Sequence, residues 1–200
     1  MLWVVKKMSR WLILILVALV PILGGCLVSR AGYESARYKV VRTDGKFELR
    51  DYPAITVVET PMKSPGQEAD HGFMRLFHFI TGDNAAKQKI SMTTPVFMTG
   101  SGTNLTMAFV MPAKLAPAEV PKPADPGLTI RELPAGRFAV LRYSGGRNNR
   151  QETNQLARLQ AWLTAQSLPV LSPPVYGYFD PPWTPTFLRR NEVMLRTAIN

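Results

Sequence analysis

The sequence predicts an α+β domain in which two related halves build one antiparallel sheet or distorted barrel with two helices. Short β-branched and aromatic runs between turn residues indicate strands, and each half has one helical stripe of apolar residues. The two halves also share short motifs in the same order. The chain has 200 residues, 46% hydrophobic and 19% charged, a composition typical of one globular domain.

Three pairs of motifs carry the internal repeat, at offsets of 81, 83 and 87 residues. The pairs are Leu-Arg-Asp-Tyr-Pro-Ala at 49–54 with Ile-Arg-Glu-Leu-Pro-Ala at 130–135, residues 75–82 with 158–165, and residues 104–107 with 191–194. The slowly rising offsets indicate a duplicated unit of about 80 residues. Two units are too few for a solenoid. We therefore expect one pseudo-two-fold domain over residues 38–200, with half-repeats at about 38–111 and 128–200.

Strands are predicted from β-branched and aromatic runs. The runs at 38–42 and 47–49 flank Asp44-Gly45, a strong signal for a hairpin turn. The run at 55–59 is expected to pair next, and the run at 138–143 provides a strand in the second half.

Each half also contains a predicted helix. Ser-Pro-Gly-Gln at 64–67 combines an N-cap, a proline in the first turn and a capping box, and Gly82 ends the helix. Its apolar stripe consists of Ala69, Phe73, Leu76, Phe77 and Ile80. The second helix is expected to be capped by Asn149 and Glu152 and to stop before Pro169.

Two proline-rich segments connect these elements. Residues 112–126 hold five prolines and are expected to form an exposed connector, whereas residues 168–185 hold six and are expected to form a long ordered loop. Arg-Arg-Asn-Glu follows at 189–192. We expect one of its arginines to be buried against its glutamate or Asp180, the motif to hold the Pro-Pro-Trp loop, and Trp183 to pack on that loop.

The first 25 residues have the organisation of a secretory signal. Residues 1–10 contain three basic and no acidic side chains, and residues 11–23 are apolar, which is short for a membrane span of about 20 residues. Leu-Gly-Gly-Cys at 23–26 resembles a bacterial lipoprotein signal, in which Cys26 is lipidated after cleavage. The only cysteine of the chain lies at this position. The alternative is an uncleaved anchor with an incidental cysteine.

Cleavage predicts a lipid-anchored protein of the cell envelope that faces the periplasm. Removal of residues 1–25 takes away three basic groups, so the formal charge falls from +10 to +7. Residues 26–37 are expected to be a tether between the lipid and the domain. Leu27, rather than Asp, follows the cysteine, and in lipoprotein signals this favours the outer over the inner membrane.

Three stretches resemble the SOUL/haem-binding protein family. They are Phe-Glu-Leu-Arg-Asp-Tyr-Pro-Ala at 47–54, Lys-Ile-Ser-Met-Thr-Thr-Pro-Val at 89–96, and the segment at 178–193 that contains Pro-Pro-Trp-Thr and Arg-Arg-Asn-Glu-Val. The resemblance covers residues 36–197. It implies a distorted barrel with two helices and reversible binding of haem or another tetrapyrrole in a surface cleft. Some relatives carry a histidine in the first motif; the matching residue here is Asp51, a hard carboxylate and a poor partner for haem iron.

Candidate haem-binding residues cluster on the first predicted helix. His71, Met74, Arg75 and His78 are spaced i, i+3, i+4 and i+7, so a regular helix places them on one face. His78 is the first choice for an iron ligand because it lies among aromatic residues. The remaining candidates are Phe77 as an apolar contact, and Lys63 and Lys89 as partners of the propionates. The alternative is that these histidines and lysines simply face solvent.

Other classes of protein have weaker support. One cysteine and two histidines exclude a disulfide framework and cysteine-rich zinc or iron–sulfur sites. The chain has no hydrolase elbow, metalloprotease or nucleotide-binding motif, so we expect a binding protein and not an enzyme. The positive charge favours anionic partners but forms no basic stripe, so nucleic acid is not expected. We also expect a monomer.

The sequence leads to one main functional hypothesis and two alternatives. The main hypothesis is an envelope-anchored haem or tetrapyrrole carrier, buffer or scavenger. The first alternative is a binding module for another amphipathic anionic small molecule. The second is a hydrolase or a tetrapyrrole-modifying enzyme.

Overall fold

The computed structural model describes residues 32–62, 69–101 and 104–199. Residues Glu34–Asn200 form one compact unit with its own hydrophobic core, as expected of a part that folds independently. The predicted signal, Cys26, Lys63 and the predicted cap at 64–67 lie outside the described residues. Within the described part of the chain, no helix is long and apolar enough to cross a membrane.

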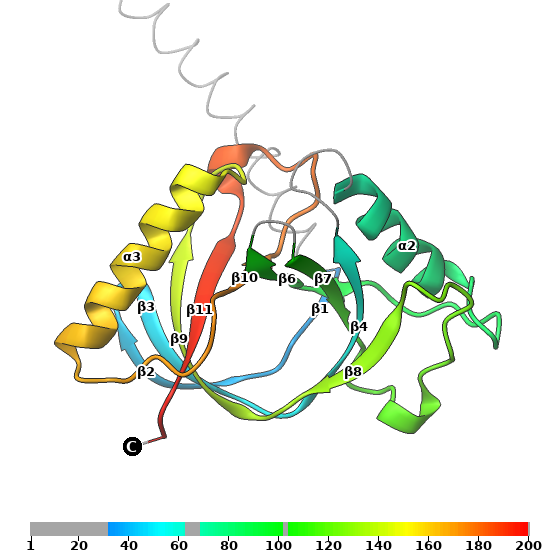
Figure 1. Cartoon of the computed structure of the whole chain (residues 1–200), viewed down its shortest axis with the longest axis horizontal. Helices are drawn as coiled ribbons and strands as arrows, with labels where there is room; N and C mark the ends of the chain where they lie inside the picture. The colour runs from blue at the N-terminus through cyan, green and yellow to red at the C-terminus, as the bar shows by residue number, and fades with distance from the viewer. Residues whose placement is uncertain (1–31, 63–68, 102–103, 200) are drawn as a thin grey trace, which may run out of the picture. The chain divides into compact units, whose positions relative to one another are not determined.

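The described residues of the compact unit form two α-helices and a nine-stranded antiparallel sheet (Figure 1). The helices are α2 (Ala69–Thr81) and α3 (Asn149–Ala165), with short 3-10 turns η1 (Pro117–Glu119) and η2 (Thr186–Leu188). The strands are β1 (Glu34–Ser35), β2 (Lys39–Asp44), β3 (Phe47–Tyr52), β4 (Ile55–Met62), β5 (Thr93–Thr94), β6 (Val96–Ser101), β7 (Asn104–Val110), β8 (Thr129–Leu133), β9 (Gly136–Tyr143), β10 (Val175–Tyr178) and β11 (Asn191–Thr197). The short strands β1 and β5 pair in parallel as a separate two-stranded sheet, and the other nine strands form the large sheet. The predicted α+β class is confirmed.

The strand order reflects the internal repeat. The large sheet runs β2-β3-β9-β11-β10-β6-β7-β4-β8. By the sequence offsets, β3 matches β8, β4 matches β9 and β7 matches β11, and β6 and β10 hold the same place in the order of their halves. Apart from β2, the order is therefore symmetric about the pairing of β10 with β6, with α2 and α3 in equivalent places.

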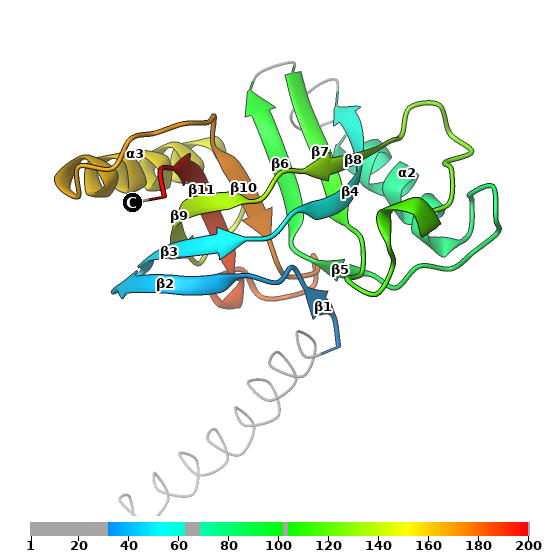
Figure 2. The same ribbon diagram turned by 90° about the horizontal axis from the view of Figure 1, so that it is seen from below.

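Two pairs of consecutive strands run from one half of the sheet to the other. β3 continues into β4 across Pro53-Ala54, and β8 continues into β9 across the matching Pro134-Ala135. β3 pairs with β9 and β4 pairs with β8, both antiparallel. Figure 1 shows these segments at the bottom of the molecule, and Figure 2 shows them from below with the helices behind. Each half of the sheet thus includes a strand from the other half of the chain.

The sheet does not close into a barrel, and it fits the predicted distorted sheet or barrel. Its two edges are β2 and β8, which lie at opposite ends of the strand order and do not pair. The strands β9, β11 and β10 of the second half of the chain are followed at one end of the sheet by β3 and β2 of the first half. At the other end, β6, β7 and β4 of the first half are followed by β8 of the second half, so the two free edges lie at opposite ends. The six residues of β2 are all exposed, as expected of an uncovered edge.

Both helices cover the same face of the sheet. Side chains alternate along each strand, so every second residue faces the helices and the residues between them point to the opposite face. Leu76, Phe79 and Ile80 of α2 pack in one core cluster. Leu159, Trp162 and Leu163 of α3 pack in a second. A third cluster occupies the opposite face, on which no helix of the described residues lies, and includes Tyr52, Phe97, Ala108, Val140 and Met194.

Local structure at three places can be compared with the prediction. The hairpin at Asp44-Gly45 joins β2 to β3, and Gly45 has φ +58°, which favours glycine. Helix α3 is capped one residue earlier than predicted, because the Asn148 side chain accepts a hydrogen bond from the Gln151 amide. The folded unit begins at Glu34, inside the predicted tether, since Ser35 and Ala36 form hydrogen bonds with Thr94 of β5.

Candidate functional site

Helix α2 presents one face to the core and another to solvent. Leu76 and Phe79 are fully buried, whereas Met74 and Phe77 keep 42% and 39% of their surface exposed. Gly72 allows the helix to approach β4 closely, because a Cβ atom at this position would lie 3.3 Å from Cγ of Met62. The close approach brings the outer face of α2 next to the end of β4.

A pocket of about 430 Å³ lies between α2 and the end of β4. Its lining residues are Pro61, Met62, His71, Gly72, Met74, Arg75 and His78. The structure therefore brings together His71, Met74, Arg75 and His78, the four residues that helical spacing placed on one face. Both histidines are exposed and accessible to a ligand.

The other predicted site residues lie elsewhere. Phe77 does not line the pocket; its ring stacks on Phe73 at a centroid distance of 6.0 Å, and Phe73 packs on Phe109. Lys89 is exposed in the segment after α2 and does not line the pocket either. Lys63 lies outside the described residues.

Arg75 already has a carboxylate partner at the pocket. Its Nε lies 3.5 Å from Oδ2 of Asp125 in the proline-rich connector, and both side chains are partly exposed. The other carboxylate oxygen of Asp125 accepts a hydrogen bond from the amide of Gly127. A ligand carboxylate would therefore compete with Asp125 for the guanidinium, which makes Arg75 a cation for reversible binding.

The chemistry of these side chains fits a haem. Imidazole and thioether groups are common axial ligands of haem iron, and a guanidinium is a good partner for carboxylates such as propionates. Within the described residues, the pocket combines two imidazoles, two thioethers and one guanidinium. Asp51 takes no part in it, because its two oxygens accept hydrogen bonds from Arg137 at 2.7 and 2.9 Å. These hydrogen bonds hold the pKa of Asp51 below its usual value.

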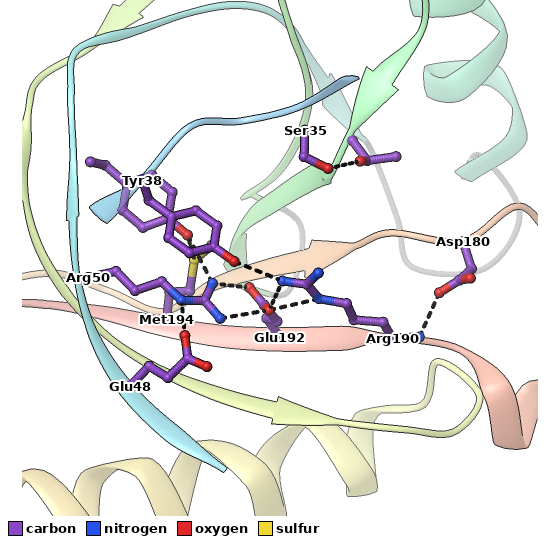
Figure 3. Close-up of polar contacts among 10 residues, drawn as sticks. Ser35, Tyr38, Glu48, Arg50, Asp180, Arg190, Glu192 and Met194 are labelled. Atoms are coloured by element: carbon purple, nitrogen blue, oxygen red, sulfur yellow. Dashed lines mark hydrogen bonds and ion pairs between the residues drawn. The ribbon is translucent and has the colours of Figure 1, made fainter. Parts of the chain in front are cut away.

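A buried charged cluster occupies the helix-free face (Figure 3). Arg50 and Glu192, fully buried on β3 and β11, form two hydrogen bonds of 2.7 and 3.0 Å. Arg190 also binds Glu192, at 2.6 Å, and Glu48 binds Arg50 at 2.6 Å. Burial opposes the charge on Arg50, but the hydrogen bonds and charge of Glu192 outweigh it and raise the pKa of Arg50. Burial raises the pKa of Tyr52 to about 12. The Tyr52 hydroxyl accepts a hydrogen bond from Arg50.

The sequence indicated only part of this cluster. One arginine of the Arg-Arg-Asn-Glu motif was predicted to be buried against Glu192 or Asp180, and Arg190 pairs with Glu192. The burial of Arg50 was missed. The signal was its place in an alternating strand, where Tyr52 lies two residues further on the same face. The cluster holds its charges in place by mutual pairing, so its role is structural.

The Pro-Pro-Trp loop is fastened by its backbone. Arg189 donates hydrogen bonds to the carbonyl oxygens of Thr184 and Pro182, as expected of a residue that holds the loop. The packing of Trp183 was predicted wrongly, because 74% of its surface is exposed. Phe187 is 71% exposed in the same loop. Since Arg189 binds carbonyl groups, the loop keeps its shape without a buried indole.

Comparisons with known proteins relate the chain to one family and to several solved folds. The sequence model of the family described as SOUL heme-binding protein matches residues 33–196. No curated protein matches the chain. The fold is similar to the C-terminal domain of EcmrR, with a TM-score of 0.55, 12% identity and coverage of 82% of this chain and 99% of that one.

Two structures from Listeria innocua share the same fold. One is titled an uncharacterized conserved protein, with a TM-score of 0.58, 9% identity and coverage of 76% of this chain and 92% of that one. The other is titled a hydrolase, with a TM-score of 0.57, 9% identity and coverage of 79% and 94%. At these identities the structural likenesses concern the fold alone. The sequence match is of a different kind and spans the compact unit almost from end to end: the chain belongs to the SOUL heme-binding protein family.

Proposed function

We propose that this protein binds haem or a related tetrapyrrole reversibly in the α2 pocket and acts in the cell envelope as a carrier, buffer or scavenger, and not as an enzyme. One observation carries the proposal: two histidines, Met74 and Arg75 line a single pocket on a chain of a haem-binding family. The pocket lies on the outer face of a helix and is therefore open to ligand exchange.

Each side chain has a definite role in this proposal. The imidazole of His78 is the first candidate for the iron ligand, with His71, about two helical turns towards the N-terminal end of α2, as the second. The Arg75 guanidinium donates hydrogen bonds to a propionate. Met74 and the exposed edge of Phe77 provide apolar surface next to the pocket. Bound haem would supply the iron centre and a flat apolar ring.

A haemin titration tests the site. The chain from residue 27 onward keeps the whole compact unit, so it is the protein to use. We expect a saturable, stoichiometric change in the Soret band. His78→Ala should change the band shape and weaken binding about ten-fold or more, which corresponds to about 1.4 kcal/mol. Arg75→Ala should weaken binding without changing the band shape, because Arg75 does not ligate iron.

The second half of the chain offers a matched control. Arg158 of α3 is the repeat equivalent of Arg75, and Ala161 stands at the equivalent of His78. Arg158→Ala should therefore leave the haemin titration unchanged. If no saturable Soret change occurs, tetrapyrrole binding is wrong for this chain. If the change occurs but neither histidine affects it, haem is held elsewhere or by its face and propionates alone.

The anchoring part of the proposal rests on the sequence. The apolar segment followed by Leu-Gly-Gly-Cys supports lipidation of Cys26, and Glu34, where the compact unit begins, is the eighth residue after this cysteine. A tether of eight residues reaches at most about 28 Å. The lipid would therefore hold the binding domain close to the membrane surface.

Replacement of the cysteine tests the anchor. The mature full-length chain should sediment with membranes and show the added mass of acyl chains in mass spectrometry. Cys26→Ser should lack that mass and remain unprocessed, whereas Ser29→Ala should behave like the wild type. An unmodified, uncleaved wild-type chain would instead support the alternative of a simple apolar anchor.

A further inference from the structure

A second pocket, of about 460 Å³, lies on the helix-free face of the sheet. It shares no residue with the α2 pocket. Both halves of the chain line it, including Pro53 and Pro134, the two matching prolines where β3 leads into β4 and β8 into β9. Its volume is within the range of small-molecule sites, about 300–1,000 Å³.

The walls of this central pocket are mostly apolar. The apolar lining residues include Tyr52, Ile55, Phe97, Ala108, Leu133, Phe138, Val175 and Met194. Several of them are among the buried residues of the third core cluster, so the pocket is a gap in the packing of that face. Tyr52 donates a hydrogen bond to the sulfur of Met194, so these two side chains are already engaged with each other. The described lining contains no histidine and is unlike the α2 pocket in this respect.

Two arginines line the central pocket, and they differ in whether a carboxylate pairs with them. Arg131 is paired with Glu59 at 3.6 Å. Arg196 is half-buried and forms no ion pair with the described residues; among these residues its guanidinium donates one hydrogen bond, to the carbonyl oxygen of Ala135 at 2.6 Å. The remaining N–H groups of its guanidinium are available to an anion.

The position of the Arg196 guanidinium depends on a glycine. A Cβ atom at Gly136 would lie 2.7 Å from the guanidinium carbon, which is too close for any real contact. The guanidinium is also near the Phe138 ring, with 5.9 Å from its central carbon to the ring centroid. Gly136 therefore leaves the space in which a half-buried cation lies at the edge of an apolar pocket.

We infer that the central pocket is a second ligand site, which takes an amphipathic monocarboxylate. The apolar body of the ligand fills the space between Phe97, Leu133 and Phe138, and its carboxylate accepts hydrogen bonds from Arg196. A guanidinium binds a carboxylate through two parallel hydrogen bonds, and this geometry selects carboxylates over neutral polar groups. The inference is independent of haem binding at α2, because the two pockets have separate linings.

Decanoate and decanol are suitable probes because they share an apolar body and differ in charge. Calorimetric titration of the chain from residue 27 onward should show saturable binding of one decanoate per protein and weaker binding of decanol. Arg196→Met removes the cation but keeps an apolar stem; it should weaken decanoate about ten-fold and change decanol little. Gly136→Ala should weaken decanoate in the same direction because it displaces the guanidinium.

Two further variants control the test. Thr99→Phe, at a half-buried lining position of β6, should fill the pocket and abolish binding of both probes. Arg142→Met, at an exposed position of β9 outside the lining, should leave both titrations unchanged. The inference is overturned if decanoate does not bind saturably, if decanol binds equally well, or if Arg196→Met has no effect.

Haemin titrations of the same variants distinguish this inference from the proposed function. Thr99→Phe should leave haemin binding intact, and saturating decanoate should not displace haemin. If Thr99→Phe abolishes haemin binding and His78→Ala does not, the central pocket is the tetrapyrrole site and the assignment of a separate carboxylate site is wrong. If only the α2 variants lose haemin binding, haem binds at α2. The decanoate titration then decides by itself whether the central pocket is a carboxylate site.

Discussion

Glu192→Gln is expected to lower the free energy of unfolding by about 3 kcal/mol or more, because loss of one partner of a buried ion pair leaves an uncompensated charge. Glu192 is fully buried and binds both Arg50 and Arg190. A neutral amide of the same shape leaves these two guanidinium groups with too little negative charge. Urea unfolding, with the slope of the transition checked for constancy, measures the loss.

Asp51→Asn provides the matched control for this prediction. Asp51 follows Arg50 directly on β3 and is also paired with an arginine, but its side chain remains 38% exposed. An ion pair of this exposure contributes about 1 kcal/mol or less. Similar losses in the two variants would mean that the cluster around Glu192 is no more sensitive to neutralisation than a surface pair.

Phe79→Ala should have an equally large effect, about 3–5 kcal/mol, because it opens a cavity in the core. Phe79 is fully buried where α2 packs on the sheet, in the cluster that contains Val58 and Met107. The loss should appear as a lower midpoint of urea or thermal unfolding. Haemin affinity should also fall, since the helix that carries His71 and His78 is less firmly held.

Phe77→Ala is the control on the same helix. Its ring is 39% exposed and outside the core cluster, so we expect a change in unfolding free energy of about 1 kcal/mol or less. Haemin binding should weaken if Phe77 contacts the ring of the ligand. Equal destabilisation by the two alanine substitutions would contradict the orientation of α2 in this structure.

Local features of the fold could be predicted from the sequence because their signals are local. Asp44-Gly45 predicted a hairpin, and Gly45 adopts the left-handed conformation that such a turn requires. Helical spacing predicted the shared face of His71, Met74, Arg75 and His78, since only the regularity of α2 was needed. The repeat predicted two equivalent halves, which the strand order reflects.

Features that depend on distant partners could not be predicted in this way. No local pattern indicates that β3 pairs with β9 and β4 with β8, and therefore the open sheet was not distinguished from a barrel. Arg50 is buried because Glu192 lies opposite, on a strand from the other end of the chain. The central pocket was not predicted either, because its lining comes from both halves of the chain and Arg196 is positioned by a glycine on another strand.

The exchange of strands between the halves has a consequence for the order of folding. Residues 47–52 of β3 leave the ribosome early, but their partners at 136–141 in β9 are made much later. The first half of the chain lacks β8 until that point, so it cannot complete its sheet during synthesis. Contacts between residues far apart in sequence slow folding, and unpaired strand edges promote association with other chains. The large sheet of this protein can therefore be completed only after both halves of the chain are present.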